Sequence, residues 1–518
     1  MIEYRQYLIN RLRQEGVTNN SSFVGVIYGT GVGACELYEA LGLLGINENI
    51  IAFVDQNTEL KMLYHRPVIG MESVLEKANV IFVGARYSYE VVEERIRKVI
   101  KKSNERGIRI INVFKPNNSI EDKEKYLKFL ENKILRKSGH FVPYMEKGIS
   151  LSDDDSKIIA WYLPQYYPID VNDEFHGLGF TEWTNVSQAY PQYEGHYQPH
   201  IPYDVGFYDL RDKNTILRQA FLAKHYGIYG FCVHYYWFDG KKLLDEPLKL
   251  ILNNPYIDIH YCLNWATEDW TMAWDDGYER LNIKKTIIKQ NLPEHPQEFM
   301  RDIIPYMHDR RYIKVDGKPV LSIYKCDVFS RDRFCETMEA FRRIAKTEGF
   351  PDLYIMITTG SGFDEDCKLW NADALVEYQP NLMFQSGELK RVFPEGYINP
   401  NYRCNMLDVT EYLDNRDYLK SHNSEAFYRC AVTSWDNTAR KGKSGGVLYT
   451  GLTPNAMKIW LKELMMESKK IHSPEKDMVF LSSWNEWAEG SHLEPDMEYG
   501  YSWLQAVTDA LEEVRRIH

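Results

Sequence analysis

The chain has 518 residues, more than one hydrophobic core usually supports, so at least two domains are expected. A net charge of -12 and the lack of a long basic stripe argue against a nucleic-acid-binding protein. The sequence has no apolar run long enough to span a membrane, and its mean hydropathy is -0.46. Aromatic residues make up 14% of the chain, which fits either a large aromatic core or a carbohydrate-binding cleft.

Two features of the sequence predict a cytoplasmic location. The amino-terminal segment, residues 1–16, is amphipathic and charged, and it has neither the apolar core nor the cleavage site of a secretory signal. The eight cysteines are scattered and form no CxxC pair, as expected for reduced, buried thiols rather than for disulfides or a zinc site.

Residues 1–118 are predicted to form a small Rossmann-like domain. A glycine-rich turn with Gly29, Gly31 and Gly33 follows the first strand, and Asp55 ends the second, as in a dinucleotide-binding βαβ unit. The spacing is GxGxG rather than GxGxxG, so two interpretations stay open: these four residues bind a nucleotide or nucleotide-sugar, or the domain binds no ligand tightly. The domain resembles the small Rossmann-like domains attached to sugar-modifying enzymes of bacterial polysaccharide pathways. Its strands are expected at residues 23–28, 50–54, 79–83 and 109–113.

Residues 119–155 are predicted to be a helical linker, and residues 156–518 an α/β domain with a (β/α)8 TIM-barrel fold. Eight apolar runs are predicted strands, and helical patterns separate most of them. The strands are expected at residues 157–166, 228–237, 259–266, 319–326, 353–360, 374–380, 427–435 and 478–487.

Most of these strands begin with apolar residues and end with polar and aromatic ones. The carboxyl ends of barrel strands meet on one face, where the catalytic groups of TIM-barrel enzymes lie. We therefore expect a single substrate site on that face. The predicted substrate-binding residues are Tyr162, Gln165, Glu182, Trp183, His196, Tyr236, Trp237, Asn264, Trp265, Glu268, Glu377, Trp435, Asp436, Asn437, Asn485 and Trp487.

Structural interpretations of these residues stay open. The glutamates suit buried ion pairs, the asparagines suit turns, and the aromatic residues suit the core. His196, His234 and His492 have no neighbouring His or Cys at ligand spacing, so no metal site is predicted. Residues 364–366 have a DxD pattern typical of metal-dependent glycosyltransferases, but they lie in a predicted loop.

The stretch 478–496 carries the predicted catalytic pair, Glu486 and Glu489. Both follow an apolar strand and lie among tryptophans, and unpaired glutamates are rarely buried as core residues. Glycoside hydrolysis uses two carboxyl groups held in different protonation states, and indole rings stack on sugar rings. This pattern predicts a sugar site.

Several motifs resemble those of the WbsX family of bacterial polysaccharide-biosynthesis proteins. The resemblance covers about residues 157–507. That family is similar to glycoside hydrolase family 99, which contains endo-α-1,2-mannosidases and mannanases. The motifs are YLPQ at 162–165, GFTEWTNV at 179–186, GHYQP at 195–199, GFYDLR at 206–211, YYWF at 235–238, WATEDWT at 265–271, WDNT at 435–438 and the stretch 484–496.

The resemblance implies a retaining glycosidase that needs no metal and in which the substrate 2-hydroxyl participates through a 1,2-anhydro sugar. It implies that Glu486 is the base assisting the 2-hydroxyl, and that Glu489 protonates the leaving oxygen and then activates water. The expected substrate is an α-linked, mannose-like glycoside of an oligosaccharide or lipid-linked glycan in O-antigen or capsule metabolism. Two alternatives stay open: a nucleotide-sugar-dependent glycosyltransferase of polysaccharide biosynthesis, and a non-catalytic glycan-binding scaffold.

Overall fold

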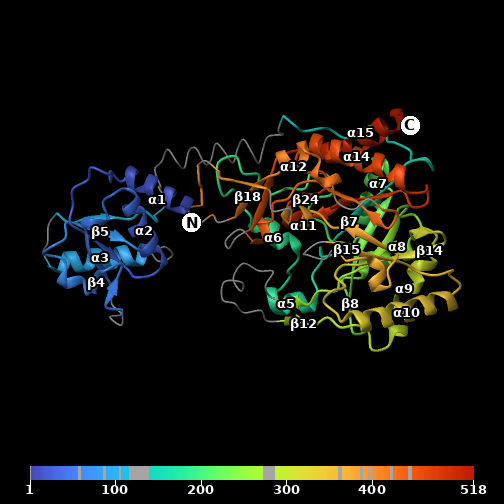
Figure 1. Cartoon of the computed structure of the whole chain (residues 1–518), viewed down its shortest axis with the longest axis horizontal. Helices are drawn as coiled ribbons and strands as arrows, with labels where there is room; N and C mark the ends of the chain where they lie inside the picture. Colours follow the sequence, from blue (N-terminus) through green and yellow to red (C-terminus); the bar gives the residue numbers. More distant parts are fainter. Residues whose placement is uncertain are drawn as a thin grey trace. The chain divides into compact units, whose positions relative to one another are not determined.

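The chain divides into two compact units, Met1–Tyr126 and Leu127–His518, which appear in blue and in green to red in the computed structural model (Figure 1). Most of the predicted helical linker lies outside the described residues. The structure describes residues 2–55, 60–85, 89–103, 107–115, 139–271, 286–359, 365–385, 389–394, 396–399, 402, 404–420, 424–441 and 446–517.

The first unit is built on a six-stranded sheet with the order β3-β4-β2-β1-β5-β6. Only β3 is antiparallel to its neighbour, and the five parallel strands, numbered along the chain, have the order 3-2-1-4-5. This is the order at the start of the doubly wound dinucleotide-binding sheet. The strands are β1 (Gly25–Tyr28), β2 (Ile50–Val54), β3 (Met62–Leu63), β4 (Arg66–Ile69), β5 (Val80–Val83) and β6 (Arg109–Ile111).

Helices cover both faces of this sheet. Alternate strand residues point to opposite faces, so Ile27 packs with α1 (Ile2–Gln14) and α2 (Val32–Leu43), whereas Val26 packs with α3 (Tyr89–Ser103). Strands β3 and β4 were not predicted, because Pro67 and the neighbouring polar residues interrupt the apolar pattern there.

The second unit is a closed barrel of eight parallel strand segments. The hydrogen-bonded path runs β19-β16-β15-β14-β10-β8-β7-β22-β20, and it closes because β19 and β20 are consecutive parts of residues 427–432. All eight predicted strands are found, which confirms the predicted TIM barrel. They are β7 (Lys157–Tyr162), β8 (Gly230–Phe238), β10 (His260–Trp265), β14 (Lys318–Ile323), β15 (Tyr354–Thr359), β16 (Ala374–Glu377), β19 (Phe427–Tyr428) with β20 (Cys430–Val432), and β22 (Met478–Ser482).

Helices follow most of the strands, and the last two, α14 and α15, pack side by side (Figure 1). Only the 3-10 turn Cys367–Trp370 is seen between β15 and β16, within the described part of that connection. The helices are α7 (Lys213–His225), α8 (Glu246–Asn253), α9 (Pro296–His308), α10 (Arg331–Thr347), α14 (Pro454–Ile471) and α15 (Ser502–Ile517).

Among the residues that the structure describes, no helix is both long and apolar enough to cross a membrane. All eight cysteines belong to those residues, and each is a free thiol.

A buried ion pair holds the point where the barrel closes. Glu377, at the end of β16, accepts a hydrogen bond from the Cys430 amide at 2.9 Å and lies 3.4 Å from the Arg429 guanidinium. Arg429 also donates to the Tyr418 carbonyl at 2.8 Å. The predicted alternative for Glu377, a structural ion pair, is therefore the arrangement seen.

Replacing Arg429 with Met should destabilise the barrel by about 3 kcal/mol, because Glu377 would keep a buried charge without its partner. The double variant Glu377→Gln/Arg429→Met should recover at least about 1 kcal/mol of this loss. Urea unfolding followed by tryptophan fluorescence measures the barrel alone, since all 12 tryptophans lie after residue 126. Equal stability of the single and double variants would contradict the assignment.

Candidate active site

A cavity of about 240 Å³ opens at the carboxyl ends of the barrel strands. The strand β8 and the chain that follows six other barrel strands (β7, β10, β14, β16, β20 and β22) supply part of its wall, as expected for a TIM-barrel site. The lining residues are Leu163, Gln165, Asn172, His176, Phe180, Glu182, Asn185, His234, Tyr236, Ala266, Glu268, Asp269, Trp270, Thr271, Ile287, Tyr324, Tyr378, Asn381, Trp435, Arg440, Glu486 and Glu489.

The two predicted catalytic glutamates line this cavity together. After β22 the chain forms the short strand β23 (Asn485–Glu486) and the 3-10 turn η7 (Trp487–Glu489). The turn ends at Gly490, which has a φ of 62°, and a Cβ there would lie 3.0 Å from Asp436 atoms. A glycine is therefore needed for the chain to turn so close to Asp436.

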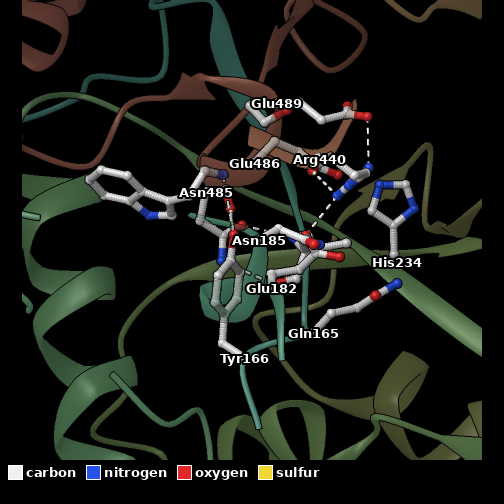
Figure 2. A network of polar contacts seen from close by, with 12 residues as sticks. Gln165, Tyr166, Glu182, Asn185, His234, Arg440, Asn485, Glu486 and Glu489 are labelled. Carbon is white, nitrogen blue, oxygen red and sulfur yellow. Dashed lines mark hydrogen bonds and ion pairs between the residues drawn. The ribbon is translucent and has the colours of Figure 1, made fainter. Parts of the chain in front are cut away.

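Arg440 lies among three carboxylates, as Figure 2 shows. Its guanidinium is 2.7 Å from Glu489, 2.9 Å from Glu182 and 3.5 Å from Glu486. Arg440 comes from α13 (Thr438–Lys441), and Glu182 is the first residue of α6 (Glu182–Gln188). Asn185 donates to Glu182 at 3.4 Å. All four charged side chains are largely buried.

The electrostatics of this cluster separate the two catalytic candidates. Burial, followed by the charge of Glu489, raises the pKa of Glu486 to about 8, although Arg440 opposes the shift. Burial also raises the pKa of Glu489, but Arg440 opposes that rise from only 2.7 Å. Because Arg440 contacts Glu489 more closely, Glu486 is the carboxyl group that holds a proton most readily in the free protein.

Hydrogen bonds to the loop after β7 hold the segment around Glu486 in place. Asn485 accepts a hydrogen bond from the Leu163 amide at 2.7 Å and donates to the Leu163 carbonyl at 2.9 Å. The Tyr166 hydroxyl accepts from the Trp487 amide at 3.2 Å and donates to the Asn485 carbonyl (Figure 2). These contacts fix residues 485–487 to the loop after β7.

Another buried carboxylate, Glu494, was not predicted. It accepts hydrogen bonds from the Trp484 and Trp487 indoles at 3.1 and 2.7 Å, from Gln219 at 2.7 Å and from Tyr208 at 2.8 Å. Burial raises the pKa of Glu494 to about 7, and these four donors oppose the rise. All four groups donate, so they favour the ionised carboxylate. Glu494 thus holds the tryptophans on either side of Asn485 and Glu486.

Besides the catalytic pair, five of the predicted substrate-binding residues line the cavity. They are Gln165, Glu182, Tyr236, Glu268 and Trp435.

The other predicted substrate-binding residues do not line the cavity, and we do not retain them as substrate contacts. They are Tyr162, Trp183, His196, Trp237, Asn264, Trp265, Glu377, Asp436, Asn437, Asn485 and Trp487.

Strand alternation explains two of these differences. Neighbouring residues of a strand point to opposite sides. Tyr236 therefore faces the cavity, whereas the Trp237 indole donates to Asp302 at 3.0 Å. Asn264 is fully buried and lies 3.1 Å from His234, whereas Trp265 packs against Phe299.

Other predicted residues support the walls of the cavity. Tyr162 donates to Gln219 at 2.8 Å, and the Trp183 indole donates to the Tyr208 carbonyl at 2.8 Å. Asn437 accepts from the Val447 amide at 2.7 Å, so it fixes its own loop. These contacts match the structural alternatives stated for these residues: core packing for Tyr162 and Trp183, and turn formation for Asn437.

His196 and Asp436 form a buried pair 2.7 Å apart. The Gln192 amide donates to Nδ1 of His196, so the ring presents its Nε2–H to Asp436. Burial raises the pKa of Asp436, but His196 and Thr438 lower it more, to about 2. The Asp436 amide donates to the Glu489 carbonyl at 2.8 Å, so this pair supports the turn that carries Glu489.

Arg440, Tyr324, Tyr378 and Trp270 line the cavity but were not predicted. Arg440 carries no local signal, since its partner Glu182 is 258 positions away. Tyr324 and Tyr378 directly follow β14 and β16, so a systematic reading of strand ends would have found them. The DxD pattern is only partly described, because Asp364 lies outside the described residues.

The predicted cofactor residues lie together at one edge of the first unit. Gly29 has a φ of 114° in the turn after β1, Gly31 precedes α2, and Gly33 lies in its first turn. The Thr30 hydroxyl donates to Asp55 at 2.6 Å, so this carboxylate already has a partner within the domain. Nucleotide binding by these residues stays a prediction.

Replacing Glu486 with Gln should stabilise the protein at alkaline pH. Its pKa is about 8 in the folded protein and near 4.5 when unfolded, so ionisation costs stability as pH rises from 4.5 to 8. We expect a gain of roughly 1–3 kcal/mol at pH 9 that disappears below pH 4.5. Urea unfolding at both pH values measures it, with exposed Glu339→Gln on α10 as the control. A gain that does not change with pH would contradict the raised pKa.

Comparisons with known proteins support the family resemblance that the sequence motifs indicate. The family described as glycosyltransferase WbsX matches residues 158–507. WxcX of Xanthomonas campestris pv. campestris, from strains ATCC 33913 and B100, is 33% identical over 362 residues. The match covers 68% of this chain and 49% of those proteins, so the chain spans about half the length of these relatives.

Among solved structures, the chain is similar to the GH99 endo-α-mannosidase from Bacteroides thetaiotaomicron, with a TM-score of 0.43 and 15% identity. That alignment covers 71% of this chain and 99% of the mannosidase. A glycoside hydrolase-like protein aligns with a TM-score of 0.41 and 12% identity, over 72% of this chain and 98% of that protein. The barrel fold is assigned from the strand topology of this chain, and the family is assigned from the match to residues 158–507. The chain belongs to the WbsX glycosyltransferase family.

Proposed function

We propose that the barrel is a glycoside hydrolase-like enzyme that cleaves or transfers an α-linked, mannose-like glycoside with retention in cell-surface polysaccharide metabolism. The observation that carries the proposal is the pair Glu486 and Glu489 on one cavity wall, with Arg440 bound closely to only one of them. Such a pair supplies one protonated and one ionised carboxyl group, which glycosidic bond cleavage requires.

The aromatic side chains of the cavity suit a sugar ligand. Trp270 and Trp435 lie at its wall with Tyr236, Tyr324 and Tyr378. Indole and phenol rings pack against the C–H faces of a pyranose. The Asn and Gln side chains of the cavity wall can bind the hydroxyl groups of a sugar. A glycan is therefore the ligand class that the lining favours.

The charge of the cavity argues against a nucleotide-sugar donor in this site. The described lining residues include five carboxylates and one guanidinium, that of Arg440, which already contacts three of them, and Lys325 from outside the lining pairs with a fourth, Glu268. A diphosphate placed there would meet uncompensated negative charge. Transfer between glycans remains compatible with the proposal, because an acceptor hydroxyl can replace water.

Two divisions of roles follow from different observations. The family 99 resemblance implies that Glu486 is the base for the 2-hydroxyl and Glu489 the acid. The free site favours the opposite order, because Glu486 holds the proton and Glu489 lies 2.7 Å from Arg440. The roles that the resemblance implies require the proton on Glu486 to move to Glu489 when a sugar binds.

Leaving-group dependence separates the two orders. Loss of the acid should cost about 10²–10⁴ in kcat on a glycoside with a poor leaving group but little on an activated aryl glycoside. Loss of the base should lower kcat on both substrates. Glu486→Gln and Glu489→Gln are to be compared on both, with exposed Glu339→Gln as the control. Full activity of both active-site variants on the poor leaving group would overturn the proposal.

Turnover should fall as pH rises through about 8 if Glu486 must be protonated, because its pKa lies there in the free protein. The pH dependence of kcat/KM measures this group in the free enzyme. A profile that stays flat from pH 7 to 10 would exclude Glu486 as the acid.

A product assay tests the reaction class. α-Mannosidic oligosaccharides, with and without an acceptor glycan, should give hydrolysis or transfer products in the absence of any nucleotide sugar. Turnover that depends strictly on a nucleotide-sugar donor would favour the glycosyltransferase alternative. Glycan binding without turnover in either assay would favour the scaffold alternative.

A further inference from the structure

The side chains of His200, His492 and Asp496 lie close together, next to the segment that carries Glu486 and Glu489. Nδ1 of His200 lies 2.8 Å from Nε2 of His492, although the residues are 292 positions apart. Nε2 of His492 lies 3.8 Å from Oδ2 of Asp496. One donor atom from each of the three side chains lies within 4.8 Å of the others. His200 is 6% exposed, and the other two are 1% exposed.

Two of these side chains, those of His492 and Asp496, are held by hydrogen bonds away from the point where the three meet. Nδ1 of His492 faces the Glu494 carbonyl at 2.9 Å, so it carries the ring proton and leaves the Nε2 lone pair directed at His200. Oδ1 of Asp496 accepts the amides of Glu498 and Tyr499 at 2.8 and 2.6 Å. An imidazole oriented by a carbonyl and a carboxylate oriented by amides are typical surroundings of metal ligands.

Aromatic stacking further restricts both rings. The His492 ring lies 3.7 Å from the Trp487 ring at an interplanar angle of 15°. The His200 ring lies 4.2 Å from the Tyr197 ring at 22°. The ligand atoms are therefore presented by rings with little freedom to turn.

Oδ2 of Asp496 is the observation that points to a ligand. This atom is buried and has no hydrogen-bond partner in the described part of the chain. The hydroxyl of Tyr197 faces Asp496 as a hydrogen-bond donor, but the contact is too long or too bent for a close hydrogen bond. A carboxylate oxygen buried without a partner costs free energy unless a cation or water binds it.

We propose that His200, His492 and Asp496 bind one divalent transition-metal ion of the zinc type. Two imidazole nitrogens and one carboxylate oxygen are ligands that zinc accepts, and a water or the Tyr197 hydroxyl would complete the set. The burial of all three side chains indicates a structural ion rather than one that contacts substrate. Spacing along the chain does not reveal this cluster, because His200 and His492 approach each other only in the folded chain.

Binding requires a small, defined change. Zinc–nitrogen bonds of about 2.0–2.1 Å separate two tetrahedral ligands by about 3.3 Å, so the rings must move apart by about half an ångström. The proton that His200 donates to His492 leaves as the ion takes its place. No other covalent change is needed.

The site would act on the catalytic segment through β24 (Ser491–His492). This strand pairs with β23, with His492 opposite Asn485 and Ser491 opposite Glu486. An ion bound to His492 and His200 therefore ties this hairpin to the loop that holds His200. This effect concerns the shape of the site and is independent of the proposed glycosidase reaction.

Metal content of the purified full chain, measured after incubation with zinc and gel filtration, tests the proposal. We expect about one zinc per chain, a lower Tm after chelation and a restored Tm after zinc is added back. Less than about one tenth of an equivalent, together with a Tm that chelator does not change, would overturn it.

The variant Asp496→Asn separates an ion from a hydrogen-bond network. Asn keeps the shape and the acceptor for the two amides but loses the charged ligand oxygen. We expect its zinc content to fall at least about tenfold and its Tm to become insensitive to zinc. The exposed His308→Gln on α9 is the control for adventitious binding by surface imidazoles and should keep the zinc. Unchanged zinc in Asp496→Asn would also overturn the site.

Discussion

Arg440 lies between the carboxylates of Glu182, Glu486 and Glu489, and all four side chains are largely buried. In a low-dielectric site one positive charge cannot compensate three negative charges, so the cluster favours a bound proton. Burial and then the charge of Glu489 raise the pKa of Glu486 to about 8, and Arg440 opposes this rise from 3.5 Å, farther than its contacts with Glu182 and Glu489. The chemical asymmetry of two similar glutamates thus follows from where one guanidinium lies.

That cluster depends on buried polar contacts beneath it. Asn485 binds both backbone groups of Leu163, and Glu494 binds the indoles of Trp484 and Trp487. These contacts use polar side chains that sequence reasoning would assign to a substrate. Each buried polar group needs a partner, so a site with many acids and amides requires a second layer of donors and acceptors to hold it. Part of the polar sequence around residues 484–496 serves this second layer.

The predicted residues that reach the cavity and those that do not differ in register and in distance along the chain. Tyr236 and Trp237 are neighbours in sequence and similar in character, yet only Tyr236 faces the cavity, because strand residues alternate. A one-residue uncertainty in strand register is enough to exchange them. Arg440 and His200 were missed for another reason. Their partners are 258 and 292 positions away, and no local pattern encodes such a contact.

The sequence by itself determined the alternation of eight apolar strands with helices, the polar ends of those strands and the motifs of the WbsX family. These features are local, since burial periodicity and strand-end composition can be read within windows of ten to twenty residues. Only the tertiary structure decided which polar side chains share the cavity, which glutamate holds the proton, and that His200, His492 and Asp496 meet. Those properties depend on distances and burial between segments far apart in the chain, because electrostatic and hydrogen-bond energies are set by separation in space.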